Sequence, residues 1–150
     1  MKLKTQAQLI AKFGDPYKAR LAFERQWMFL WIVPQDIAEA IPAMPKRIYL
    51  NRLILIPLQA TLRKLISLGL HDEIKTWDGC FNVRAKRGSS GISTHAWGIA
   101  VDLNARMNPF RGKVTWSDEF LDVWRDVGWI CGADWSVASK DGMHFQWEGF

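Results

Sequence analysis

The sequence predicts an α+β domain in which a small, mainly antiparallel sheet is flanked by helices. Three observations favour this class. The chain has 150 residues, which suits one domain with a sizeable core. Four short stretches in its second half show the alternation or apolar composition of strands. Helical patterns precede and flank these stretches instead of alternating regularly with them.

The first and last helices have clear boundary residues. A helix is predicted over 5–13, where Thr5 and Gln8 have the spacing of a capping box. Another is predicted over 117–127, because Ser117 is a good N-cap and apolar residues recur on one face. Between them, a third helix is expected to follow Pro57 and to end at a glycine, Gly69.

The strand candidates are short and lie mostly in the second half of the chain. We predict strands at 75–83, 98–103, 129–131 and 143–147. The aromatic stretch 23–33 ends at Pro34, and the segment "RIYLNRLIL" is a further candidate for extended structure. The nine tryptophans are spread along the chain, which favours a role in the core over a sugar-binding platform.

Charge and cysteine content narrow the function classes. The net charge of +5 and the pI of about 9.4 favour anionic partners without choosing among them. The densest basic cluster, "RAKRG", is too short for a nucleic-acid stripe, so no nucleic-acid partner is expected. Cys80 and Cys131 form no CxxC pair, and two buried free thiols are expected. No apolar run is long enough for stable membrane insertion.

Candidate chemistry begins in the stretch "GISTHAWGIAVDLNA" at 91–105. In a strand over 98–103, alternate apolar side chains would face the core, and the opposite face would carry only small residues and Asp102. That face leaves room for a metal and a ligand. His95 lies just before the strand, where a turn can bring its ring over the same face.

The end of the chain repeats this arrangement. In "DGMHFQW", His144 and Gln146 alternate with three apolar residues, and Asp141 stands three residues before His144. Two histidines and an aspartate are a plausible zinc set, since zinc accepts imidazole nitrogen and carboxylate oxygen. Spacing alone does not exclude histidines that are merely hydrogen-bonded within the fold.

The motifs themselves resemble a known family. "STHAWGIAVD" is similar to the SxHxxGxAxD motif of the zinc D-alanyl-D-alanine carboxypeptidases. That family includes vancomycin-resistance dipeptidases and phage L-alanyl-D-glutamate endopeptidases that act as endolysins. "DGMHFQW" resembles its second motif, "WDGCFNVR" its arginine-bearing segment, and "NPF" the sequence after its first motif. The resemblance covers roughly 45–150, so 1–44 would be a helical segment packed on this core within one domain, 1–150.

The resemblance implies a metal site and a catalytic carboxylate. His95, Asp102 and His144 would be ligands of Zn²⁺, and Asp141 would be the general base and acid. Many members have Glu at that position, and the Asp resembles the endolysin branch. Bound zinc lowers the pKa of its water to about 7, so that hydroxide is available at neutral pH. Asp141 would then take the water's proton and pass it to the leaving amine.

The resemblance also implies three further site residues. Arg84 would polarise the scissile carbonyl and stabilise the oxyanion, because it ends a predicted strand and so has a defined direction. Arg87 lies in the loop "KRGSSG" and is close enough to compete for that role or to bind substrate. Ser93 opens the first motif, where it would orient substrate or the His95 loop.

The function implied is hydrolysis of peptidoglycan stem peptides by a monomeric zinc metallopeptidase. No secretory h-region follows "MKLK", so we expect a protein made in the cytoplasm that reaches the cell wall through a holin, as an L-alanyl-D-glutamate endopeptidase endolysin of a bacteriophage. The alternatives are a D-alanyl-D-alanine carboxypeptidase in wall remodelling, a non-catalytic basic wall-binding module, and a cysteine peptidase using Cys80.

Overall fold

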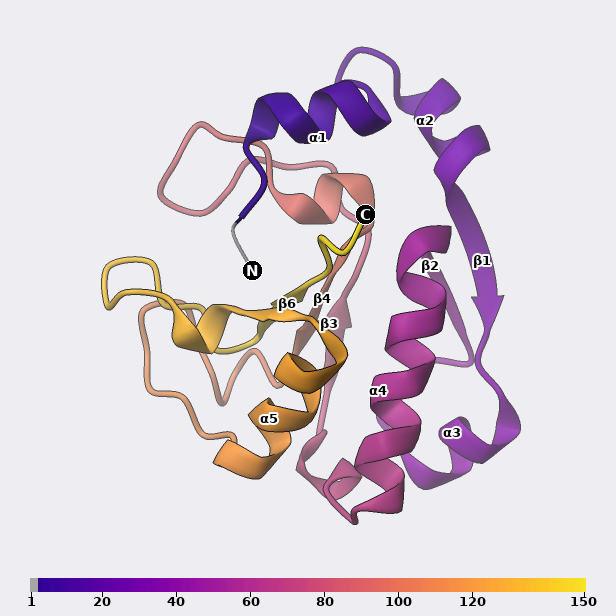
Figure 1. Cartoon of the computed structure of the whole chain (residues 1–150), viewed down its shortest axis with the longest axis vertical. Coiled ribbons are helices and arrows are strands. Elements are labelled where there is room, and N and C mark those ends of the chain that lie inside the picture. Colours follow the sequence, from indigo (N-terminus) through magenta and orange to yellow (C-terminus); the bar gives the residue numbers. More distant parts are fainter. Residues whose placement is uncertain (1–2) are drawn as a thin grey trace.

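The computed structural model describes residues 3–150 and confirms an α+β fold with two small antiparallel sheets (Figure 1). The N-terminal part contains α1 (Gln6–Phe13), α2 (Arg20–Trp27), β1 (Met28–Ile32), α3 (Gln35–Ala40), β2 (Arg47–Asn51) and α4 (Leu55–Ser67). The C-terminal part contains β3 (Trp77–Gly79), β4 (Ala100–Leu103), α5 (Asp118–Val127), β5 (Ile130–Cys131) and β6 (His144–Gln146). In the described residues, no helix is both long and apolar enough to cross a membrane.

The larger sheet contains the strands predicted from the second half of the chain. Its strand order is β3-β4-β6-β5, and every neighbouring pair is antiparallel. In the centre, Asp102 of β4 is paired with His144 of β6, and Val101 with Phe145. Val101 and Phe145 are fully buried in the core. The two sequence motifs therefore meet side by side in one sheet, with their polar residues on the same face.

The smaller sheet was predicted only in part: β2 lies within the extended candidate "RIYLNRLIL", whereas β1 and its pairing with β2 were not expected. Strand β1 pairs antiparallel with β2, from Met28 opposite Asn51 to Ile32 opposite Arg47. The segment 1–44, expected to be helical, thus contributes a strand as well as helices. Only two of the five β1 side chains are buried, and they do not alternate regularly. The sequence of this strand consequently lacks the period of two by which the others were recognised.

Strand β3 is shorter than the predicted strand 75–83. It ends at Gly79, whose φ of +143° accompanies a shift of register between Trp77 and Gly79. The chain then leaves the sheet, and only an isolated bridge between Ala85 and Ile92 follows. Arg84 therefore does not end a strand, and the argument that a strand fixes its direction was wrong.

The predicted helix boundaries are confirmed by capping contacts. Thr5 and Gln8 form the capping box of α1, and the Ser117 hydroxyl accepts a hydrogen bond from the Phe120 N–H at the start of α5 (3.1 Å). Helix α4 begins at Leu55, before Pro57 and not after it as expected. Pro57 is tolerated in its first turn because N–H groups there have no partner within the helix.

The core is one aromatic-rich cluster that extends from α1 to β6. Trp124 of α5 stacks on Phe145 of β6 with their ring centroids 4.2 Å apart. Trp97 is fully buried, and its indole N–H donates to the carbonyl of Gly14, just after α1 (2.9 Å). This contact ties the N-terminal helix to the turn that carries His95.

Candidate active site

His95 lies in a single turn of 3₁₀ helix, Thr94–Trp97, between β3 and β4. The Ser93 hydroxyl begins the turn by accepting the His95 N–H (3.4 Å). Gly98 ends it in the left-handed conformation, with φ +63°, where a side chain would also collide with Met28. Ser93 is buried, and this hydrogen bond holds the start of the His95 turn. Ser93 also lines the cleft described below.

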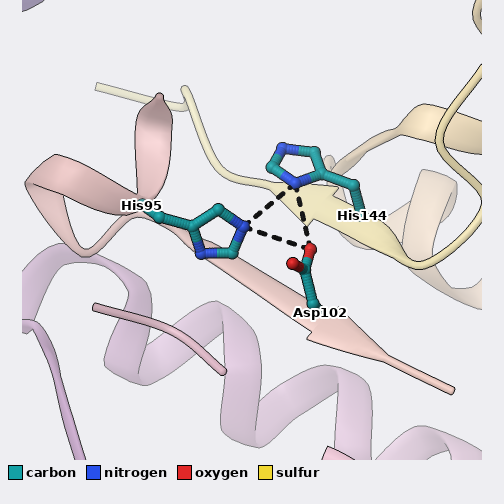
Figure 2. A group of neighbouring side chains, drawn as sticks. All are labelled: His95, Asp102 and His144. Carbon is teal, nitrogen blue, oxygen red and sulfur yellow. Dashed lines mark hydrogen bonds and ion pairs between the residues drawn. The ribbon is translucent and has the colours of Figure 1, made fainter. Parts of the chain in front are cut away.

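The three predicted metal ligands converge, as Figure 2 shows. His95 Nε2 lies 3.1 Å from Asp102 Oδ1 and 3.2 Å from His144 Nδ1. His144 Nδ1 lies 3.2 Å from the same Asp102 oxygen. All three side chains are buried. The 3₁₀ turn, β4 and β6 thus each bring one atom that could coordinate a metal to a common point.

The outer nitrogens of the two rings determine which atoms face inward. His95 Nδ1 lies 2.7 Å from the Cys80 carbonyl oxygen, which can only accept, so Nδ1 carries the proton. His144 Nε2 lies 2.8 Å from the side-chain oxygen of Gln146 and is protonated for the same reason. In the neutral rings, His95 Nε2 and His144 Nδ1 therefore present lone pairs to each other and to Asp102.

Such a group of facing lone pairs fits a cation. Three acceptors about 3 Å apart with no proton between them repel one another, whereas a metal ion at their centre stabilises all three. In tetrahedral zinc sites with bonds of about 2.0–2.1 Å, ligand atoms are about 3.3–3.4 Å apart. The observed separations of 3.1 to 3.2 Å are close to this value. The residues therefore suit zinc.

The shifts in the pKa values of Asp102 and His144 indicate that a positive charge between the three side chains is favourable. Burial opposes ionisation of Asp102, but without a metal a second proton on a ring, at the inward nitrogen, is donated to this carboxylate, and such hydrogen bonds from His144 and His95 hold the pKa of the carboxyl below its usual range. Burial likewise opposes protonation of His144, yet the Asp102 carboxylate raises the pKa of that ring above its ordinary value. A metal cation would take the position that this proton otherwise fills.

Asp141 stands at the edge of this group, in the turn before β6. Its backbone is fixed on both sides, because its N–H donates to Gly132 and its carbonyl accepts from the His144 N–H (both 3.0 Å). Any side chain at Gly132 would collide with this carbonyl. Within residues 3–150, Asp141 Oδ1 is buried and has no hydrogen-bond partner. Burial raises the pKa of the carboxyl, which suits a group that exchanges protons.

A cleft of about 560 Å³ opens over His144 and Asp141. Its lining comes from the N-terminal residues 3–9, the loop 84–94 and the loop 135–141, which lie on one side of the molecule in Figure 1, together with Phe110, Arg111 and residues 144–148. The volume lies in the range of about 300–1,000 Å³ that is typical of small-ligand sites. Arg84, Arg87 and Arg111 line the cleft, so its walls are largely basic.

Both candidate arginines reach the cleft from the loop 84–94. The backbone carbonyl of Arg84 accepts the Ser93 N–H (3.0 Å), which holds Arg84 beside the first motif in place of the expected strand. Its guanidinium donates to the adjacent Ala85 carbonyl (3.2 Å). Arg87 is exposed and approaches the sulfur of Met143 (3.8 Å), and its charge favours ionisation of Asp141.

We expect Arg84→Ala to lower turnover about 10²–10³-fold without loss of zinc, as removal of an oxyanion donor does. Arg87→Ala should mainly weaken substrate binding. Arg84→Lys should rescue poorly, because an ammonium lacks the planar fork of guanidinium. Steady-state kinetics on a defined stem peptide measure both effects. A large loss of turnover in Arg87→Ala with none in Arg84→Ala would reverse the two roles.

Sequence reasoning missed four site residues. Thr94 and Gln146 contact the His144 ring, Glu148 holds Gln146, and Trp135 lies beside His144 with ring centroids 5.4 Å apart. A signal existed for Gln146, since it alternates with His144 and so shares its face of β6. Trp135 reaches the site from a loop, for which no periodicity applies.

The cysteines do not form a nucleophilic site. Cys80 and Cys131 are both buried free thiols, as expected. Burial raises the pKa of the Cys80 thiol, whereas a catalytic cysteine needs a lowered one. Burial also raises the pKa of Cys131, to about 12. Cys80 contacts His95 through its carbonyl and not its sulfur, which argues against the cysteine-peptidase alternative.

Comparison with known proteins agrees with the motif. Residues 87–147 match the model of a family described as D-alanyl-D-alanine carboxypeptidase, so the resemblance noted in the sequence is confirmed over this narrower range. The matched segment contains His95, Asp102, Asp141 and His144, and Arg84 lies outside it. Neither the search of curated proteins nor that of solved structures gave a match.

Proposed function

We propose that this chain, whose residues 87–147 match the D-alanyl-D-alanine carboxypeptidase family, is a zinc peptidase that hydrolyses the stem peptides of peptidoglycan. The observation that carries the proposal is the buried triad of His95, Asp102 and His144. Its three inward atoms have the spacing of zinc ligands, and with neutral rings they present lone pairs to one point. A non-catalytic wall-binding module would not need such a group beside Asp141, whose Oδ1 is buried and has no hydrogen-bond partner among residues 3–150.

The residues around the triad supply the acid–base chemistry. When bound, zinc would polarise the scissile carbonyl and the attacking water. Asp141 Oδ1 is free to accept the proton of that water and to pass it to the leaving amine. The guanidinium of Arg84 lies in the cleft wall, from which it would stabilise negative charge on the carbonyl oxygen. Ser93 keeps the His95 turn in place during these steps.

Among stem-peptide bonds, we propose the L-alanyl-D-glutamate bond as the substrate. An internal bond needs space on both sides of the reacting carbonyl, and the cleft is lined from the N-terminal segment to the loop 135–141. Aspartate at position 141, as in the endolysin branch, supports the same choice. The matched family, described as D-alanyl-D-alanine carboxypeptidase, favours the D-alanyl-D-alanine bond, which is the second candidate.

The proposed place of action is the bacterial cell wall. A net charge of +5 favours binding to an anionic envelope, and the basic walls of the cleft favour acidic peptides. We propose that the enzyme acts there as a monomeric endolysin, released from the cytoplasm through a holin.

Digestion of purified peptidoglycan, followed by mass spectrometry, tests the proposed function. An L-alanyl-D-glutamate endopeptidase should release fragments with new N-terminal glutamate, and a carboxypeptidase should release free D-alanine. Fragments with new glutamate termini that disappear when zinc is chelated would support the first choice. Free D-alanine alone would establish the second, and no cleavage by the zinc-loaded protein would contradict both.

A further inference from the structure

A chain of buried polar side chains lies behind His144 and takes no part in the reaction outlined above. His144 Nε2 is 2.8 Å from Gln146 Oε1, and the Gln146 amide nitrogen donates to the Glu148 carboxylate. The other Glu148 oxygen accepts the backbone N–H of Lys4. The Thr94 hydroxyl lies 3.3 Å from both Gln146 Oε1 and His144 Nε2.

We propose that Gln146 and Glu148 are positioning residues that hold His144 in the tautomer whose Nδ1 faces the metal. The inference rests on the proposed function only in taking His144 as a zinc ligand. An imidazole can bind a metal through either nitrogen, and the hydrogen bond at the other nitrogen decides which one is free. Here the partner of Nε2 is a side-chain amide, which can present either an acceptor or a donor.

Glu148 removes this ambiguity. A carboxylate only accepts hydrogen bonds, so the Gln146 amide must turn its NH₂ toward Glu148 and its oxygen toward His144. If the amide were reversed, its NH₂ would face the His144 ring and its oxygen would face the carboxylate. The orientation of one buried amide therefore fixes the proton on Nε2 and the lone pair on Nδ1.

The burial of Glu148 supports a role beyond simple packing. Only 3% of this residue is exposed, although it lies near the end of the chain. Among residues 3–150, the partners of its two oxygens are a side-chain amide and a backbone N–H, which are both neutral. A buried carboxylate with only neutral partners is costly. Through Gln146 it increases the electron density of the His144 ring, which strengthens the ring as a metal ligand.

Zinc affinity, measured by competition with a chromophoric chelator, tests the proposal. Gln146→Ala should weaken zinc binding about 10–100-fold, as loss of such an outer partner typically does. Glu148→Gln should also weaken it, since one amide oxygen cannot serve both N–H donors. The double variant Gln146→Glu/Glu148→Gln exchanges carboxylate and amide, satisfies every donor and keeps the charge. It should restore an affinity close to that of the unmodified protein.

Thr61→Val is the matched control. The buried Thr61 hydroxyl accepts the indole N–H of Trp129 (3.0 Å), in a part of the core that contributes nothing to the chain behind His144. This variant loses that hydrogen bond and the one that the hydroxyl donates to the Pro57 carbonyl (2.8 Å), and it should keep its zinc affinity, so a general loss of stability is separated from loss of positioning. The effect of each variant on the unfolding temperature of the zinc-free protein is measured alongside.

The outcomes distinguish this inference from the proposed function. If the unmodified protein binds zinc and cleaves peptidoglycan, but Gln146→Ala binds zinc as tightly, the positioning role is wrong and the function stands. If the unmodified protein binds no zinc, the function itself is wrong. Should Gln146→Ala fail to fold, Glu148→Gln and the double variant decide the matter, because failure of the exchange to restore affinity overturns the proposal.

Discussion

His95→Ala and His144→Ala are expected to bind no zinc at the site and to lose all detectable peptidase activity. Each substitution removes one of three donor atoms that lie within 3.1 to 3.2 Å of one another. The remaining two ligands would leave Asp102 buried beside a single imidazole. Metal analysis after dialysis measures the loss, and circular dichroism checks that the variants are folded.

The third histidine provides a matched control for these variants. His71 lies in the turn His71–Glu73 after α4, half-buried and outside the cleft. His71→Ala should therefore keep one zinc per chain and full activity. Full zinc occupancy in folded His95→Ala and His144→Ala would show that the metal is bound elsewhere and would refute the ligand assignment.

Asp141→Asn is expected to keep zinc and to lose about 10²–10⁴ in turnover, the usual contribution of general acid–base catalysis. Asparagine has almost the same shape but cannot accept a proton. The backbone contacts that place residue 141, from Gly132 and to His144, do not involve the side chain and should persist. The measurement is kcat on a defined stem peptide, together with zinc content.

Asp126→Asn on the exposed surface of α5 makes the same chemical change away from the cleft. Its turnover should equal that of the unmodified protein. If Asp141→Asn also retained near-normal turnover, another group would have to act as the base, and the role assigned to the second motif would be wrong.

The metal ligands could be predicted because each motif carries its own geometry. Alternation along a strand places Asp102 on the face opposite to that of the core-facing Val101 and Leu103, and it places His144 on the face opposite to that of Phe145. Antiparallel pairing of β4 with β6 then makes these two polar residues direct neighbours. Local pattern and side-chain direction were sufficient to place Asp102 and His144 on one face, because a strand has only two faces, whereas their assignment as zinc ligands together with His95 came from the resemblance of the motifs to the carboxypeptidase family.

The loop residues could not be predicted in this way. The direction of Arg84 depends on the bulge at Gly79 and on a hydrogen bond from Ser93, and neither is visible in a local pattern. The N-terminal wall of the cleft depends on contacts across almost the whole chain, such as that between Lys4 and Glu148. Loops have no period that restricts where a side chain points.

What the sequence predicts and what only the tertiary structure decides differ in how far apart along the chain the interacting residues lie. Helix caps, strand alternation and the His–Asp motif act within a few residues, so the α+β class and the three ligands follow from the sequence. The choice of ring nitrogen in His95 and His144 depends on a carbonyl 15 residues away and on an amide oriented by the buried Glu148. Packing of a distant segment brings the Cys80 carbonyl to His95. Gln146 and Glu148 are close to His144 in the chain, but Glu148 is held by the backbone N–H of Lys4 from the other end of the chain, so only the tertiary structure decides which atoms face the metal.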